Sequence, residues 1–82
     1  MSTPPRLRRF SPARLRQRRA ELGLSQLALA RLLGLTSPRA DRTIQAWEAG
    51  ARQPGASNLY ALAAALGVNA DWLMVSPRAK KK

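Results

Sequence analysis

Residues 22–50, LGLSQLALARLLGLTSPRADRTIQAWEAG, decide the fold of this chain. Ser25 is placed to cap a helix that reads QLALARLLG and ends at Gly34. A second helix is expected to carry Ile44 and Trp47 on its apolar face, three positions apart, and to stop at Gly50. The stretch therefore predicts two short helices joined by a turn.

A further helix is expected before this pair. The Ser-Pro pair at 11–12 is a typical helix start, because serine caps the amino end and proline loses nothing at the first helical position. Gly23 is the expected stop. Leu15, Arg19 and Leu22 would form the inner stripe of this helix, so Arg19 should need a partner.

The carboxyl-terminal part predicts one apolar helix and one short segment. Ser57 or Asn58 is expected to start LYALAAALG, which stops at Gly67, and Asn69 can cap ADWLMV. No stretch has the alternation of a strand. We therefore expect an all-α, compact five-helix domain over residues 11–75, between a flexible basic arm (1–10) and a basic disordered tail (76–82).

Composition restricts the function classes. The 82 residues include neither cysteine nor histidine, so thiolate or imidazole metal sites and nucleophilic or base catalysis by these residues are excluded. The acids number four, and their spacing suggests no catalytic pair. We therefore expect that the protein is not an enzyme and that it binds no cofactor, metal ion or small-molecule ligand. No apolar run is long enough to span a membrane, and no secretory signal is evident.

The charge predicts a polyanionic partner. Fifteen Lys and Arg stand against four Asp and Glu, a net charge of +11. Neutralised phosphates release counterions, so nucleic acid is the first candidate and an anionic membrane surface the second. Arg6, Arg8 and Arg9 place part of this charge in the arm.

The order and spacing of these features resemble the helix-turn-helix domain of phage repressors and Cro proteins, the xenobiotic-response-element regulators. The resemblance covers roughly residues 13–75. The matching residues are Arg19, Leu22-Gly23-Leu24-Ser25-Gln26, Leu29-Ala30, Leu33-Gly34-Leu35, Thr43-Ile44, Trp47-Glu48, Gly50, Arg52, Pro54, Leu59, Leu62-Ala63, Leu66-Gly67 and Asp71-Trp72-Leu73.

The resemblance implies a sequence-specific, double-stranded DNA-binding transcription regulator, most simply a repressor, that inserts a recognition helix (about 38–49) in the major groove. It implies a homodimer at least on DNA, in the cytoplasm and associated with the nucleoid. It also implies a structural ion pair between Arg19 and Glu48. The segment 71–75 is a candidate for the dimer surface or, equally, for closure of the core.

Candidate DNA contacts follow from this resemblance. The expected base-reading residues are Arg39, Asp41, Arg42, Thr43, Gln45 and Ala46. The expected phosphate contacts are Gln26, Arg52, Gln53 and Arg18. Arms of repressors of this type wrap the duplex, which implies that Arg6, Arg8 and Arg9 reach a minor groove or the DNA backbone; alternatively, the arm only adds nonspecific affinity. For each of the arginines the alternative is a solvated surface charge, and for Gln26 it is an ordinary residue of a first helical turn.

The chain departs from the family at one place. Ile44 follows Gly34 by ten positions, where typical members have six. One interpretation extends the recognition helix backward, with Ser37 as N-cap and Pro38 as the first helical residue. The other keeps the helix short, with Asp41 as N-cap, and lengthens the turn into a loop.

Two other classes of function stay open on sequence grounds. The same fold can serve as an antitoxin or a coactivator-type protein-interaction module. Alternatively, the chain could be a basic RNA or membrane binder in which the arginines act and the helix-turn-helix does not. Binding to selected and random duplexes at several salt concentrations separates these possibilities.

Overall fold

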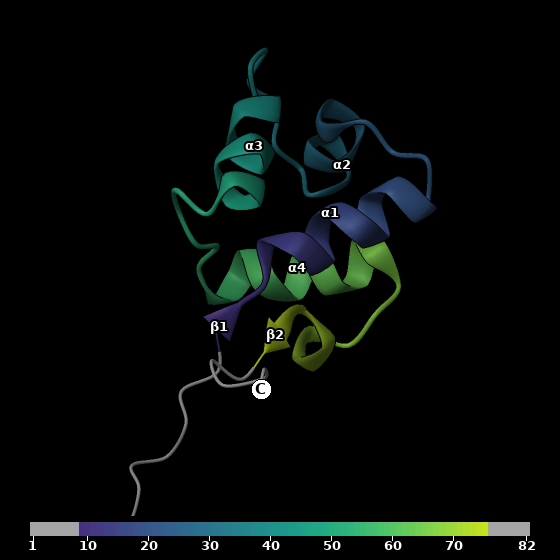
Figure 1. Cartoon of the computed structure of the whole chain (residues 1–82). Helices are drawn as coiled ribbons and strands as arrows, with labels where there is room; N and C mark the ends of the chain where they lie inside the picture. The colour runs from purple at the N-terminus through teal and green to yellow at the C-terminus, as the bar shows by residue number, and fades with distance from the viewer. Residues whose placement is uncertain (1–8, 76–82) are drawn as a thin grey trace, which may run out of the picture.

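The computed structural model describes residues 9–75 (Figure 1). Within them, four α-helices precede a 3-10 helix: α1 (Pro12–Glu21), α2 (Gln26–Leu32), α3 (Asp41–Ala49), α4 (Ala56–Leu66) and η1 (Ala70–Leu73). All five expected helical segments are present. The expected count of five holds only if η1 is included, because this short segment winds with the tighter 3-10 repeat.

A pair of two-residue strands, which the sequence did not predict, joins the ends of the described chain. β1 (Arg9–Phe10) runs antiparallel to β2 (Met74–Val75), with Arg9 opposite Val75. Phe10 is buried in the core. The prediction of a flexible arm over residues 1–10 is therefore wrong for its last two residues, because burial of a phenylalanine ring offsets the entropy lost on ordering them.

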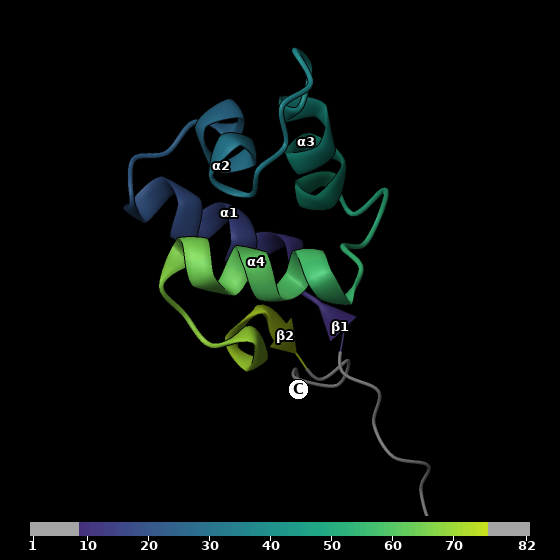
Figure 2. The same ribbon diagram turned by 180° about the vertical axis from the view of Figure 1, so that it is seen from behind.

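The core lies between three layers. α1 and α4 lie side by side in the middle, α2 and α3 pack on one side of them, and η1 with the strand pair covers the other (Figures 1 and 2). The fully buried large side chains are Leu15, Leu29, Ile44, Leu62, Leu66 and Leu73. Leu22 was expected in the inner stripe and is 42% exposed instead, because α1 has already ended at Glu21.

The helix ends agree with the expected glycine stops. Gly23, Gly34, Gly50 and Gly67 all have positive φ angles, which only glycine adopts without strain. At the amino ends, Ser11 and Ser25 accept hydrogen bonds from Arg14 N and Ala28 N as predicted.

The expected starts of α3 and α4 are wrong. Ala40 holds the N-cap position of α3, and Asp41 is its first residue, so neither Asp41 nor Ser37 is the cap. Ala40 is 3% exposed and fills the core, which fixes this end of the helix without a side-chain cap. The four extra residues therefore form a turn, as the loop alternative expected. Likewise, Gly55 holds the N-cap position of α4, which begins at Ala56 rather than at Ser57 or Asn58.

The segment 71–75 closes the core. Leu73 is fully buried, and Trp72 and Met74 pack against the buried cluster. Asn69 holds the N-cap position of η1 but makes no capping hydrogen bond through its side chain. The structure thus supports core closure for this segment, and its role as a dimer surface stays a prediction.

Candidate nucleic-acid interface

One face of α3 is left open to a partner. Ile44, Trp47 and Glu48 are buried and hold the helix on the domain. On the opposite side Arg42 and Gln45 are exposed, and Thr43 and Ala46 are half-buried. The helical repeat therefore separates the residues that anchor α3 from those that the sequence assigned to base reading.

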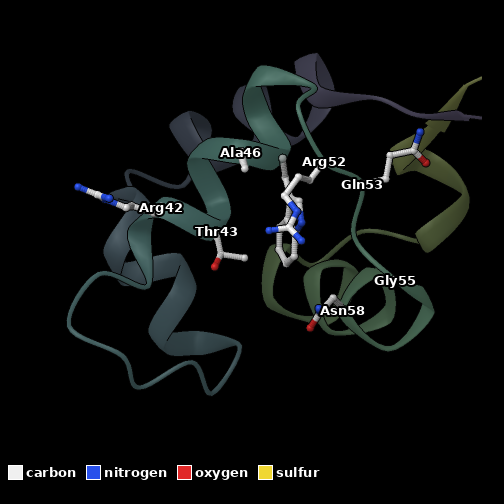
Figure 3. A pocket seen from close by; sticks show the side chains of 8 residues that line it. Arg42, Thr43, Ala46, Arg52, Gln53, Gly55 and Asn58 are labelled. Atoms are coloured by element: carbon white, nitrogen blue, oxygen red, sulfur yellow. The ribbon is translucent and has the colours of Figure 1, made fainter.

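A concavity of about 380 Å³ lies beside this face, between α3, the following loop and the amino end of α4. Figure 3 shows Thr43 and Ala46 on the α3 side, Asn58 on the α4 side and Arg52 between them, while Arg42 extends outward. Its lining residues are Arg42, Thr43, Ala46, Trp47, Arg52, Gln53, Gly55 and Asn58. Five candidates from two predicted groups, base-reading and phosphate-binding, thus meet at one surface.

The amino end of α4 belongs to this surface, and the sequence reasoning missed it. Gly55 supplies no side-chain cap, so the first N–H groups of α4 have no side-chain acceptor. The positive end of an 11-residue helix thus lies in the same concavity as the Arg52 guanidinium. The available signal is Gly55 directly after Pro54, because glycine is also found at the N-cap position.

Arg39 and Asp41 lie at the amino end of α3, outside the lining of the concavity. Arg39 Nε is 3.6 Å from Asp41 Oδ1, and the Arg39 side chain is 61% exposed. Gln45 is exposed on α3 but does not line the concavity either. These three candidates therefore extend the open face of α3 away from Arg52 and Gln53.

Gln26 has a partner inside the protein. Its side-chain Nε2 donates to Glu48 Oε1 at 3.1 Å, and the residue is only half-exposed. The amide that we assigned to a DNA phosphate is thus already held by the carboxylate of α3. The second N–H of this amide and the backbone N–H groups at this helix end keep the expected role open.

Arg18 is likewise held by the domain. Its Nε donates to Leu66 O at 2.9 Å, at the carboxyl end of α4, and its Nη1 donates to Glu21 Oε1 at 3.1 Å. These bonds direct the guanidinium toward the carboxyl end of α4, whereas the concavity lies at the amino end of that helix. The structure does not bring Arg18 together with Arg52 and Gln53.

The predicted ion pair between Arg19 and Glu48 is present. Arg19 Nε and Nη2 donate to the two carboxylate oxygens at 2.5 and 3.0 Å, and Nη1 donates to Leu24 O at 2.8 Å. Hydrogen bonding to Glu48 raises the pKa of Arg19 above its ordinary value. The pair, with Gln26, ties the first three helices together beneath the open face of α3.

Of the arm candidates, Arg6 and Arg8 lie outside the described residues. Arg9 is exposed on β1, which lies on the opposite side of the α1–α4 layer from α3 (Figures 1 and 2). The expected tail over 76–82 also lies outside the described part. Of the arm, the described residues Arg9 and Phe10 both lie away from the open face of α3.

Some chemical roles find no support in residues 9–75. This part of the chain brings together no group of three or more acidic, histidine or cysteine side chains that could hold a metal ion. None of its helices is long and apolar enough to cross a membrane. Of the described aromatic residues, Trp47 lies within the core, Trp72 packs against it and Tyr60 is exposed.

The sequence and the fold both match known helix-turn-helix proteins. A helix-turn-helix family model matches residues 15–73. The crystal structure of the P22 c2 repressor in complex with synthetic operator 9T in the presence of Tl⁺ superposes with a TM-score of 0.68 at 34% identity. That match covers 76% of this chain and 88% of the other. No curated protein matches the sequence.

Proposed function

Because the chain belongs to the phage repressor and Cro family of helix-turn-helix proteins, we propose that it occupies operator DNA as a repressor with α3 in the major groove. The chain is a sequence-specific DNA-binding transcription regulator. The observation that supports the placement of DNA is the concavity, which combines the open face of α3 with Arg52 and the amino end of α4.

The open face suits base reading. Arg42 is exposed on α3, and arginine donates two hydrogen bonds to guanine O6 and N7. Gln45 is exposed one turn along the helix and suits adenine N6 and N7. Thr43 and Ala46 offer methyl groups to thymine. We assign these four residues to sequence readout.

The concavity suits the sugar-phosphate backbone. Arg52 brings a charge to its lining, and the amino end of α4 adds free N–H donors with a positive helix dipole. Gln53 also lines the concavity, with its amide directed away from Arg52 (Figure 3). Asn58 adds a further polar side chain. Contacts of this kind fix the register of the protein on the duplex but carry no base preference.

We propose that two copies bind a two-fold symmetric operator. A recognition helix of nine residues covers only one half-site, and paired half-sites lie one helical turn apart, about 34–36 Å. Such a regulator acts where the DNA is, in the cytoplasm at the nucleoid, and needs no catalytic group. Lengthening the operator centre by about five base pairs should abolish joint binding, whereas about ten should restore part of it.

Selection of bound duplexes from a random pool tests the function. The selected site should bind at least about 10³-fold more tightly than random duplex at physiological salt. Arg42→Ala should then relax the preference at one position by about 1–3 kcal/mol. Arg52→Ala should instead weaken binding to all sequences. It should also lower the salt slope, the steepness with which the logarithm of the binding constant falls with the logarithm of the salt concentration, by about one. Equal affinity for selected and random duplexes would contradict the proposal.

A further inference from the structure

Hydrogen bonds brace the turn at residues 36–40 at both of its ends. Arg31 Nη1 donates to Leu35 O at 2.9 Å and to Ser37 O at 2.8 Å. Ser37 O also accepts from Ala40 N at 3.1 Å, and Ser37 Oγ accepts from Arg39 N at 3.2 Å. Since Ala40 is buried, the extra residues form an ordered projection before α3.

Arg39 is the charged side chain that this projection carries. It lies two residues before the start of α3, and its side chain is 61% exposed. An α-helix rises about 1.5 Å per residue, so a residue before its first turn reaches past the base pairs covered by Arg42 and Gln45. With α3 in the major groove, the turn would thus place a guanidinium next to base pairs that lie beyond the amino end of α3.

Asp41 lies beside this guanidinium as an ion-pair partner, beyond hydrogen-bonding distance. Its Oδ1 lies 3.6 Å from Arg39 Nε, so the carboxylate faces the Nε edge. The two terminal nitrogens, Nη1 and Nη2, are then free to form the paired donors that guanine O6 and N7 require. The adjacent carboxylate also disfavours a phosphate as the partner of Arg39, because two anions would compete for one cation.

We propose that the turn at residues 36–40 is a second DNA-reading element, in which Asp41 orients Arg39 toward a guanine beyond the base pairs that α3 covers. This inference rests on the proposed function. Arg31 acts as a positioning residue that holds the turn, and Asp41 as a positioning residue that holds the side chain. Each half-site is therefore longer than α3 alone can read.

The experiment is site selection with wild type and Arg39→Ala, Arg39→Lys, Asp41→Asn and Arg31→Ala. Wild type should select a guanine flanking the part of the site that depends on Arg42. Arg39→Ala should lower the preference for this guanine by roughly 5- to 150-fold. Arg39→Lys should lower it similarly at an unchanged salt slope, because lysine keeps the charge but not the paired donors.

Asp41→Asn separates orientation from charge. Removing the carboxylate should tighten binding to random duplex, because the protein loses an anion near DNA, yet lower the preference for the flanking guanine. Arg31→Ala should lower that same preference while the thermal unfolding midpoint stays close to that of wild type, since Arg31 is exposed.

Three results would overturn the inference. The first is an unchanged preference at every position in both Arg39 variants. The second is an equal loss for all sequences with a salt slope lower by about one in Arg39→Ala, which means a phosphate contact. The third is that Asp41→Asn tightens selected and random duplexes equally. Failure of the proposed function looks different, since wild type itself would then show no preference.

Discussion

Arg19 and Glu48 form a two-pronged ion pair that joins α1 to the inner face of α3, with Nε 2.5 Å from Oε2 and Nη2 3.0 Å from Oε1. The Glu48 side chain is only 5% exposed and that of Arg19 17%. The remaining polar atoms also have partners: Gln26 donates to the carboxylate, and Arg19 donates to Leu24 O. The pair thus fixes the orientation of α3 relative to α1.

Glu48→Ala should be strongly destabilising. It leaves the Arg19 guanidinium and the Gln26 amide without their acceptor in a largely buried site, which costs about 3–5 kcal/mol. Urea unfolding followed by circular dichroism measures the change. Glu21→Gln is the matched control, because it breaks a more exposed ion pair with Arg18 and should hardly move the midpoint. A Glu48→Ala change no larger than that of Glu21→Gln would show that the pair is not structural.

The buried ring of Phe10 should also contribute to the stability of the domain. Phe10→Ala should cost about 3 kcal/mol, because the ring is 7% exposed and lies in the core cluster. Arg9→Ala, on the exposed neighbour in β1, should stay within about 0.5 kcal/mol. Thermal unfolding of both variants decides the matter. If both variants have the same unfolding midpoint, the β1–β2 pair does not stabilise the domain.

Periodicity and capping predicted most of the helices but not the strand pair. The apolar spacing of Ile44 and Trp47 and the caps at Ser11 and Ser25 depend on neighbours within one or two turns, so the sequence reveals them. Phe10 meets Met74 across 64 positions in a two-residue strand, which leaves no local pattern. The start of α3 was missed for a similar reason, because tertiary burial of Ala40 replaced a side-chain cap.

Several arginines that composition counts only as charge also bond to the protein itself. In α1, Arg14 donates to Trp72 O, Arg16 to Glu48 O and Arg18 to Leu66 O, each near the carboxyl end of another helix. Such carbonyls lack partners within their own helix, and a cation there also suits the helix dipole. Composition counts charges but does not tell which of them bond to the protein itself.

Arg14 and Arg52 should therefore respond in opposite ways. Arg14 Nη1 lies 2.8 Å from Trp72 O, and its guanidinium carbon lies 5.2 Å from the centre of the Trp72 ring. Arg14→Ala should cost about 1–2 kcal/mol of stability and leave the salt slope of DNA binding unchanged. Arg52→Ala should lower that slope by about one and leave stability within about 0.5 kcal/mol. Denaturant melts and salt titrations of the two variants, side by side, test this contrast. A lower slope for Arg14→Ala would place α1 at the DNA.

Ala46→Glu should abolish tight DNA binding while the domain stays folded. Ala46 lines the concavity and is half-buried in the middle of α3, so a carboxylate there projects toward the proposed position of DNA. Anions placed against phosphates or base acceptors cost several kcal/mol, and we expect a loss of at least about 30-fold, roughly 2 kcal/mol. Fluorescence anisotropy on the selected duplex measures it.

Ala64→Glu is the matched control for this change. It puts the same side chain at an exposed position in the last turn of α4, in a separate apolar groove lined by Leu32, Leu33, Ala61, Ala64 and Ala65. Both variants lower the net charge equally, so the general loss of attraction to DNA is the same in each. The excess loss in Ala46→Glu then reports the local surface. If Ala64→Glu weakens binding as much, the concavity does not face the duplex, and the placement of α3 in the major groove is wrong.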